Sequence, residues 1–455
     1  MNKRQDMTQG SLADKILLYT IPIICTSVLQ QLFNAADIAV IGQFVGKEAM
    51  AAVGSNSSIV SLMINLFVGI ALGSNVVIAH AVGMRDTKAI EKAVHNSILL
   101  ALAGGVIALV VGELLAGPIL NMTGVPAEVF DMAVLYLRIY CLGMPVILLY
   151  NFESAIFRAY GDTRTPLLAL VFAGVINVGL NLFLVVVLHR SVDGVAIATV
   201  TSNLISSLFL LWKLTHTNKD IRVRLGLLKP DKIMISNILR IGVPAGLQGS
   251  MFSFANVIVQ SAVNSLGPTV MAASSAALNI EAIAYFVMNA FSQACTTFVG
   301  QNHGAGKFDR CRRVFKISLG LDALFTGSVC VLILIFGHQI LGIFNSDPEV
   351  IRVGYMRLAF IFFAYILSMV QEVGSGYLRG FGMSLVPALV ALVCICGLRL
   401  FWIFAIFPHW PTFRTIMLIY PISLWTTGII ILLMILIIRP SRKMEASVSK
   451  MNQAV

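Results

Sequence analysis

Long apolar blocks without a single charged side chain are the feature that most restricts how this sequence can fold. Residues 49–84, 165–188, 241–280, 282–306 and 415–438 contain no Asp, Glu, Lys or Arg. A helix needs about 20 apolar residues to cross a bilayer, so each block can supply one span. Only 12% of the residues are charged, about half the share in soluble domains. The sequence therefore predicts an all-α membrane protein.

The full set of apolar blocks predicts twelve transmembrane helices joined by short connections. The predicted spans are 16–41, 49–82, 94–116, 131–157, 166–188, 194–215, 236–264, 270–301, 314–338, 350–377, 385–407 and 416–438. The longest connection falls between the sixth and seventh spans. The predicted parts are an N-lobe of residues 1–215, an inter-lobe linker of 216–235, a C-lobe of 236–438 and a tail of 439–455.

The two halves of the chain repeat each other at an offset of about 221 residues. Because each half has an even number of spans, both halves enter the membrane from the same side and the repeat is parallel. This predicts two pseudo-symmetric six-helix lobes around a central cleft. The matched residues are Pro22 and Pro244, Asn34 and Asn256, Gly83 and Gly304, Arg138 and Arg357, Glu153 and Glu372, Arg158 and Arg379, Gly161 and Gly382, and Pro166 and Pro387.

The distribution of Lys and Arg predicts the orientation, because basic residues near span ends stay on the cytoplasmic side. With both termini cytoplasmic, the cytoplasmic segments hold 25 of the 32 basic residues and the rest of the chain holds seven. This asymmetry also accounts for the net charge of +11 as a topology signal and an attraction to anionic lipid. We expect no nucleic-acid partner.

One polar cluster is predicted in the N-lobe around Asp37, because a carboxylate inside a span costs about 3 kcal/mol and is usually kept for a function. Asn34 lies one helical turn before Asp37, and Asn177 and Asn181 share one face of the fifth span. Thr199 adds a hydroxyl in the sixth span. These residues are predicted to couple an ion or proton, or else Asp37 reaches water near the outer interface and the amides join helices.

Two further intramembrane residues are candidates for a functional role. Pro22 removes a backbone hydrogen bond in the first span and permits a kink that protonation can modulate. Glu281 is isolated between two charge-free blocks, and burial disfavours its charged form whereas a cationic ligand favours it. Glu281 and Asp37 are therefore predicted to bind substrate. The alternative for Glu281 is a structural partnership with an arginine, for which Arg399 is the candidate.

The repeated charges near the cytoplasmic ends of the fourth and tenth spans are candidates for an inner gate. Glu153 and Glu372 would pair with Arg158 and Arg379 when the gate closes. The alternative is that these residues are simply solvated at the membrane interface. Asp322, Glu113 and Arg138 are interpreted in the same interfacial way, because they are also placed near predicted span ends.

No enzyme or nucleotide site is predicted. The sequence has no phosphate-binding GxxxxGK[ST] run and no HExxH or Cys/His cluster for a metal. We therefore expect no cofactor, and energy from an ion gradient: one elementary charge across 100 mV supplies about 2.3 kcal/mol, enough for roughly fifty-fold accumulation.

Three motifs in order give the chain a specific resemblance. QQLFNAADIAVIGQFVGKEAMAAVG (30–54), AIFRAYGDTRTPL (155–167) with its counterpart GYLRGFGMSLVPAL (376–389), and FVGQNHGAGK (298–307) resemble the multidrug and toxic compound extrusion (MATE) family over essentially the whole chain. The resemblance implies a V-shaped pair of six-helix lobes and proton- or sodium-coupled export of cationic drugs and dyes. The branch it resembles is that of the bacterial multidrug efflux pumps, which implies a bacterial-type plasma (inner) membrane location.

The resemblance also assigns residues by position. It implies that Asp37 is the family's first-span acid, Pro22 its kinking proline and Asn177 its fifth-span asparagine. The acid that many members of this branch carry one turn farther on is replaced by Asn181. This departure leaves one carboxylate in the N-lobe cluster, so neither the coupling ion nor its stoichiometry follows from the family.

Two other classes of function compete with this one. A flippase of lipid-linked precursors predicts many Arg and Lys residues in the cleft, whereas only Arg399 is placed deep in a span. A membrane scaffold has no use for costly intramembrane acids. We therefore expect an ion-coupled (H⁺ or Na⁺) antiporter of small organic cations that works by alternating access as a monomer.

Overall fold

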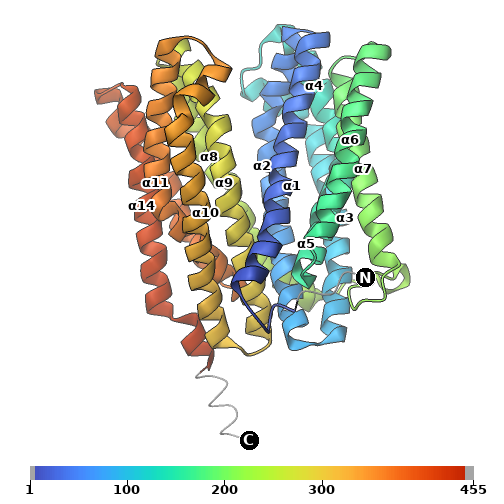
Figure 1. Cartoon of the computed structure of the whole chain (residues 1–455). Helices are drawn as coiled ribbons and strands as arrows, with labels where there is room; N and C mark the ends of the chain where they lie inside the picture. Colours follow the sequence, from blue (N-terminus) through green and yellow to red (C-terminus); the bar gives the residue numbers. More distant parts are fainter. Residues whose placement is uncertain (1–5, 446–455) are drawn as a thin grey trace, which may run out of the picture. The chain divides into compact units, whose positions relative to one another are not determined.

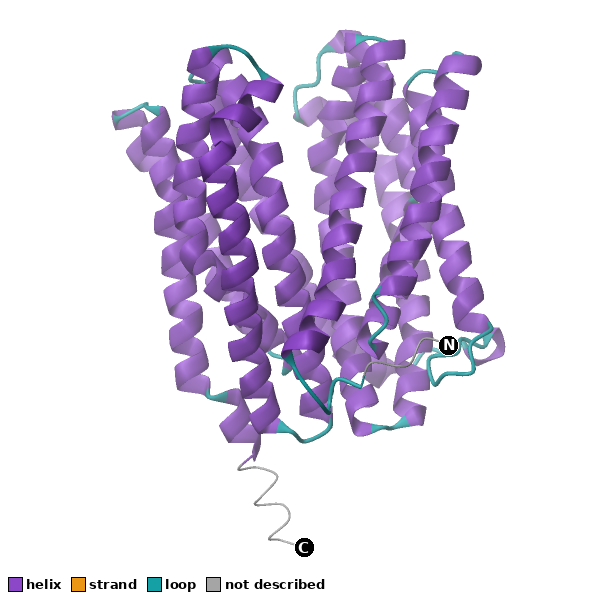
Figure 2. Cartoon of the chain, in the orientation of Figure 1, coloured by secondary structure: helices purple, strands orange, loops and turns teal. Residues whose placement is uncertain are grey.

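The computed structural model describes residues 6–445, and this part of the chain is helical with short loops and no strand (Figure 2). The end of the predicted cytoplasmic tail, residues 446–455, and the basic residues Lys3 and Arg4 lie outside the described residues. The prediction of an all-α fold is confirmed.

The helices follow one another along the chain as Figure 1 colours them. In order they are α1 (Ala13–Phe44), α2 (Lys47–Met84), α3 (Thr87–Met122), α4 (Ala127–Leu142), α5 (Met144–Tyr160), α6 (Arg164–Leu182), the π-helix η1 (Phe183–Val187), α7 (Val192–Thr215), the 3-10 turn η2 (Leu225–Leu227), α8 (Lys232–Asn264), α9 (Pro268–Gly304), α10 (Phe308–Phe344), α11 (Pro348–Gly380), α12 (Leu385–Ala391), the π-helix η3 (Leu392–Gly397), α13 (Leu398–Phe401), the π-helix η4 (Trp402–Ile406), the 3-10 turn η5 (Phe407–His409) and α14 (Phe413–Ile438).

Most predicted spans correspond to one helix each. Among the described residues, ten helices are long and apolar enough to cross a membrane, and the pair α4–α5 supplies an eleventh span if it is counted as one. The remaining predicted span is α8, whose 33 residues make it about 50 Å long. Arg240, Gln248 and Asn256 interrupt its apolar residues.

The fourth predicted span differs from its expected form. Instead of one helix over 131–157, α4 and α5 meet at a 49° bend at Gly143. Pro145 follows the bend and has no backbone N–H to continue the ladder of α4. The matching span of the second half, α11, has no proline at this point and continues for 33 residues without a break.

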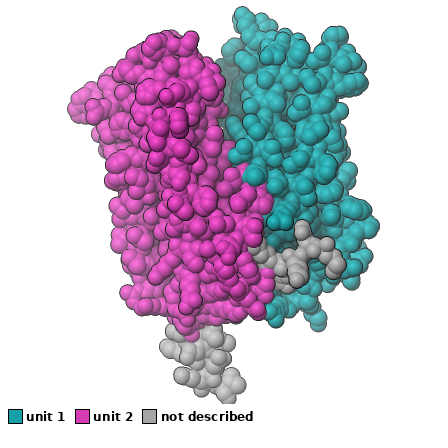
Figure 3. Space-filling view, in the orientation of Figure 1, with its two compact units in different colours: residues 1–5, 25–246 teal, residues 6–24, 247–455 magenta. Residues whose placement is uncertain are grey.

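The chain forms two compact units, which Figure 3 colours separately. Unit 1 contains Cys25–Gly246, and unit 2 contains Asp6–Ile24 together with the residues from Leu247 onward. Helices α1 and α8 therefore each divide between the units, because Ile16, Tyr19 and Ile23 of α1 pack into the core of unit 2. The predicted lobes follow the repeat in the sequence, and their boundaries and the cleft between them stay predictions.

Glycines bring α8 against α2 inside unit 1. A Cβ atom at Gly69 would overlap the backbone at Gly246, and one at Gly73 would fall 2.7 Å from the backbone nitrogen of Gly242. Small residues let helix backbones approach closely where lipid gives no hydrophobic force between helices. These four glycines therefore hold the first half of α8 in unit 1.

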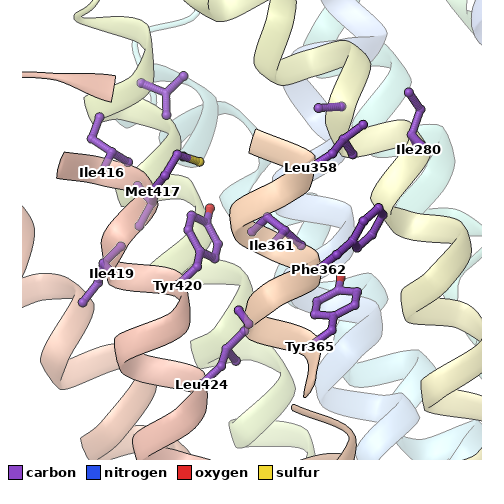
Figure 4. Close-up of a cluster of buried hydrophobic side chains, with 14 of the residues drawn as sticks. Ile280, Leu358, Ile361, Phe362, Tyr365, Ile416, Met417, Ile419, Tyr420 and Leu424 are labelled. Carbon is purple, nitrogen blue, oxygen red and sulfur yellow. The ribbon is translucent and has the colours of Figure 1, made fainter. Parts of the chain in front are cut away.

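Unit 2 has its largest apolar cluster between α9, α11 and α14. Figure 4 shows Ile280 on α9, Leu358 and Phe362 on α11, and Tyr420 on α14 within this cluster. The tyrosine is the polar member of the set, and its ring lies close to two buried guanidinium groups.

The turns after α5 and α11 confirm one detail of the repeat. Gly161 and Gly382 occupy matching positions, and both adopt positive φ angles, 98° and 79°. Glycine is favoured in this left-handed region because it lacks a Cβ atom. The repeated glycines therefore end two equivalent helices in the same way.

The segment between α7 and α8 is fastened to α3. His95 Nε2 accepts a hydrogen bond from the backbone N–H of Arg224 at 3.0 Å, and Asn96 Oδ1 accepts one from the N–H of Asp231 at 2.8 Å. Asp231 in turn accepts from the N–H groups of Ile233 and Met234 and pairs with Lys92 at 3.0 Å. The backbone N–H of Met234 and the Lys92 side chain lower the pKa of Asp231.

Adding one methyl group at Gly73 should destabilise unit 1. Gly73→Ala forces the backbones of α2 and α8 apart, and overpacking of this kind typically costs about 1–3 kcal/mol. Gly54→Ala on the same helix is the matched control, because a Cβ there meets nothing within 4 Å. Thermal unfolding in detergent should show a lower melting temperature for Gly73→Ala alone. Equal melting temperatures for the two variants would contradict the close helix contact.

Removing the Asp231 carboxylate should fray the first turn of α8. A lowered pKa means that the charged cap stabilises the fold above the unfolded pKa of about 3.9 and loses this effect as the pH falls through the lower folded value. Hydrogen exchange at the amides of Ile233 and Met234 should be faster in Asp231→Ala than in the wild type at neutral pH. The control Asp220→Ala, in the same linker, should exchange like the wild type, and the cap is disproved if Asp231→Ala does too.

Candidate functional site

The structure brings four of the predicted N-lobe residues together within unit 1. Asn181 Nδ2 on α6 donates to Asp37 Oδ1 on α1 at 2.5 Å, and Thr199 Oγ1 on α7 donates to Asp37 Oδ2 at 3.1 Å. The same Asn181 nitrogen lies 3.3 Å from Asn177 Oδ1. We call Asp37, Asn177, Asn181 and Thr199 the acidic cluster.

The carboxylate of this cluster has only neutral hydrogen-bond donors. Asp37 is 7% exposed, and within the described part of the chain no Lys or Arg forms an ion pair with it. Asn181 Oδ1 is buried and has no hydrogen-bond partner. An unpaired buried acid beside an unsatisfied oxygen is a site that can accept a proton, or a hard cation that prefers oxygen ligands.

Two tyrosines that were not predicted lie near the acidic cluster. Tyr136 and Tyr140 on α4 are in electrostatic range of Asp37, and their rings stack with centroids 6.1 Å apart. No sequence signal distinguishes them, because aromatic residues four positions apart on an apolar helix are usually packing residues.

Two predicted residues do not join the acidic cluster. Asn34 lies one turn before Asp37 but is exposed, and no hydrogen bond joins the two side chains. Pro22 is buried in the part of α1 that belongs to unit 2. It lies 15 residues before Asp37, about 22 Å along the helix axis, so any influence on Asp37 passes through the helix itself.

Glu281 forms an ion pair with an arginine. Arg357 on α11 donates from Nε and Nη2 to the two carboxylate oxygens of Glu281 on α9, at 3.1 and 2.9 Å. Arg357 Nη1 also donates to Ser274 at 2.8 Å, and its side chain is 1% exposed. The alternative of a structural partnership between Glu281 and an arginine is therefore confirmed, but Arg399 was the wrong candidate, because the partner is Arg357. The bidentate geometry argues against Glu281 as a free acid for a cationic substrate.

Arg399 has a different set of partners. Its Nη1 donates to Asn256 Oδ1 on α8 at 2.6 Å, and its Nε to Ser423 Oγ on α14 at 3.4 Å. The guanidinium carbon lies 5.2 Å from the ring centroid of Phe252 and 4.7 Å from that of Tyr420. No carboxylate of the described residues forms an ion pair with it.

The four predicted gate residues lie in different surroundings. Glu153 is fully buried and accepts from Ser207 Oγ at 2.9 Å, so its predicted alternative of interfacial solvation is wrong. Arg379 Nη2 donates to Gln248 Oε1 at 2.7 Å, and its charge lies in electrostatic range of Glu372 without an ion pair between them. Arg158 is half-buried. The gating role of these residues stays a prediction.

The interfacial interpretation holds for two of the three residues to which it was applied and fails for the third. Asp322 lies 14 residues into α10, is 0% exposed and accepts from Thr326 at 2.6 Å, so the interfacial interpretation is wrong for it. The sequence misled because the basic residues at the start of the same helix continue to Lys316, only six positions before Asp322. Glu113 and Arg138 form a partly exposed ion pair at 3.8 Å, which fits the interpretation.

A metal centre is not among the features of the described residues, since no three His, Cys, Asp or Glu side chains gather as a group.

The protein-family comparison decides the identity of the fold. One family model, MatE, matches the chain twice, over residues 22–183 and 244–404, which together make up more than half of its length. The chain belongs to the MatE family. The double match also confirms the duplication seen in the sequence, and membership of a transporter family agrees with the expectation that the chain is not an enzyme.

Relatives and solved structures agree with the MatE assignment. The chain is 27% identical over 402 residues to the probable multidrug resistance protein YoeA of Bacillus subtilis (strain 168), covering 87% of each protein. It is 27% identical over 395 residues to the probable multidrug resistance protein NorM of Thermotoga maritima, covering 85% of this chain and 84% of that protein. The crystal structure of a MATE protein in the bent conformation matches with a TM-score of 0.90 at 22% identity, over 98% of this chain and all of that one.

These findings confirm the resemblance and the class of fold. The protein is a multi-pass membrane transporter of the MatE family, and the solved MATE structure shares its all-helical fold. The roles of individual residues in this MatE protein depend on its own geometry.

The ion pair in this MatE protein should behave as a structural unit. Leaving one buried partner of such a pair unpaired costs about 3–5 kcal/mol, so Glu281→Gln and Arg357→Met should each lower the melting temperature strongly. The double variant Glu281→Gln/Arg357→Met should recover part of the loss, because no charge is left unpaired. Thermal unfolding in detergent measures all three.

If the effects of the two single substitutions on the melting temperature are not coupled, Glu281 would again be a candidate substrate-binding residue. Single variants that keep the wild-type melting temperature but lose dye binding would show that Glu281 is a ligand-binding acid instead.

Proposed function

We propose that this MatE protein is a cation-coupled antiporter that exports small amphipathic organic cations by alternating access, with Asp37 as the coupling residue. The observation that carries the proposal is the burial of Asp37 among neutral partners in the acidic cluster. Relatives named as probable multidrug resistance proteins support small, chemically varied substrates.

The acidic cluster can hold an ion in either of two ways. A proton on Asp37 removes the buried charge, and Na⁺ neutralises it through the oxygens of Asp37, Asn177 and Thr199 and the unpartnered Oδ1 of Asn181. Both routes reduce the cost of the carboxylate in an apolar bundle. An arriving organic cation neutralises the same charge, so ion and substrate compete, which is the requirement for antiport.

Coupling between ion and substrate passes through the helices that meet at Asp37. The carboxylate joins α1 to α6 and α7, so a change in its charge alters the hydrogen bonds between three helices. We propose that this change shifts the balance between inward-facing and outward-facing states. The protein acts as a monomer in the plasma (inner) membrane, with both termini cytoplasmic.

The alternative of a lipid-linked precursor flippase has little support. It requires several unpaired basic residues to hold a pyrophosphate, whereas of the two buried arginines Arg357 is already paired with Glu281. The MatE match favours export of small molecules.

Ethidium transport into proteoliposomes tests the proposal directly. With a proton gradient and a sodium gradient imposed separately, at least one should drive accumulation by the wild type, up to roughly fifty-fold per charge at 100 mV. Asp37→Asn should reduce the gradient-driven rate to that of empty liposomes, because the coupling charge is gone. Thr199→Val should retain coupling at a lower rate, since it removes one neutral hydrogen bond.

Glu128→Gln is the matched control, because it removes an exposed carboxylate from the start of α4, and it should transport like the wild type. The proposal fails if neither gradient drives ethidium in the wild type, or if Asp37→Asn responds to the gradient as the wild type does.

A further inference from the structure

Arg399 in unit 2 carries a buried positive charge that coupling at Asp37 does not use. Its side chain is 1% exposed, and its hydrogen-bond partners are the neutral oxygens of Asn256 and Ser423. Neutral acceptors and aromatic faces stabilise a guanidinium but do not cancel its charge. A buried cation without a counter-ion is costly and marks a functional site.

The neighbouring charges leave an excess of one positive charge around Tyr420. Arg357 and Arg399 both face this ring, with guanidinium carbons 5.5 and 4.7 Å from its centroid. Glu281 is the acid of the set, and both of its oxygens bind Arg357. The positive charge of Arg399 is therefore the one that remains for an anion.

The backbone around Arg399 is irregular in a way that is common at functional sites. Arg399 lies in α13, a helix of four residues between the π-helices η3 and η4. π-Helical turns cost stability and occur frequently where a side chain must be re-aimed for function. The distortion thus coincides with the buried cation.

The helices that hold Arg399 are the repeats of those that hold the acidic cluster, but the charge they carry has the opposite sign. In unit 1, an acid on the first span, Asp37, meets an amide on the fifth, Asn181. In unit 2, an amide on the seventh span, Asn256, meets a base on the eleventh, Arg399. The seventh and eleventh spans are the repeats of the first and fifth, so the duplicated helix pair holds an acid in one unit and a base in the other.

We propose that Arg399 is the centre of an oxyanion-binding site in unit 2, which takes the carboxylate or phosphate group of an aromatic compound. Arginine presents several N–H donors in the fork that matches such oxyanions, and Arg399 uses Nε and Nη1 for its protein partners. The ring of Phe252 is only partly buried and offers a surface against which an aromatic compound stacks. The site rests on the proposed export function and extends its substrates to zwitterionic and anionic aromatic compounds.

Equilibrium binding of two matched dyes tests the site. Rhodamine 110 has a free aromatic carboxylate, and rhodamine 123 is its methyl ester, so the pair shares one ring system and differs by a single methyl group that removes the oxyanion. Fluorescence anisotropy with purified protein in detergent should give a Kd for rhodamine 110 about tenfold lower than that for rhodamine 123, as expected for one charge-assisted hydrogen bond. Arg399→Gln should remove this preference by weakening rhodamine 110 binding only.

Controls separate the site from general effects of charge and stability. Arg414→Gln changes an exposed arginine on α14 and should keep the preference for rhodamine 110. Arg399→Lys retains the charge without the fork and should show an intermediate preference. On the wild type alone, benzoate or phenyl phosphate should displace rhodamine 110 whereas benzamide should not, and the stronger of the two competitors identifies the oxyanion.

The proposal is overturned if the wild type binds both dyes equally, if benzamide competes as well as the two anions do, or if a folded Arg399→Gln protein keeps the preference. Because binding is measured without a gradient, a failure of ion coupling at Asp37 leaves these results unchanged. Absence of the dye preference together with intact gradient-driven ethidium transport in the wild type would overturn the oxyanion site alone.

Discussion

The cost of a charge inside an apolar helical bundle governs every functional feature of this molecule. Its buried charged groups meet that cost in different ways. Glu281 and Arg357 neutralise each other through two hydrogen bonds, whereas Arg399 relies on amide, hydroxyl and aromatic neighbours. Asp37 has hydrogen bonds but no counter-charge. The first solution is structural, and we propose that the other two leave a charge for a mobile partner to cancel.

Because of the duplication, the two units have helices in the same order, but their buried polar side chains differ. The matching helices α5 and α11 end at equivalent glycines, and α2 and α9 have nearly equal lengths of 38 and 37 residues. The polar residues between the first and fifth spans of each half have diverged to opposite charge. In our proposals, this shared scaffold holds a site for cations in unit 1 and a site for oxyanions in unit 2.

Much of this structure could be predicted from the sequence, because bilayer thickness dictates span length and a misplaced charge is too costly to be hidden. The helices, their repeat and the gathering of Asp37 with Asn177, Asn181 and Thr199 follow from these rules. Side-chain pairing does not. Glu281 has two buried arginines in its own unit, and only the packing of α9 against α11 selects Arg357. The bend at Gly143 and the depth of Asp322 likewise depend on tertiary contacts that no single segment reveals.

The central claim is that the ion and the organic cation compete for the charge of Asp37, and equilibrium binding measures this most directly. The Kd of ethidium for the purified protein, titrated at a series of pH values and Na⁺ concentrations, should rise as the coupling ion is added to the wild type and stay constant in Asp37→Asn, because linkage makes the effect reciprocal. An ethidium Kd that ignores both ions in the wild type, or that keeps its ion dependence without the carboxylate, would contradict the account.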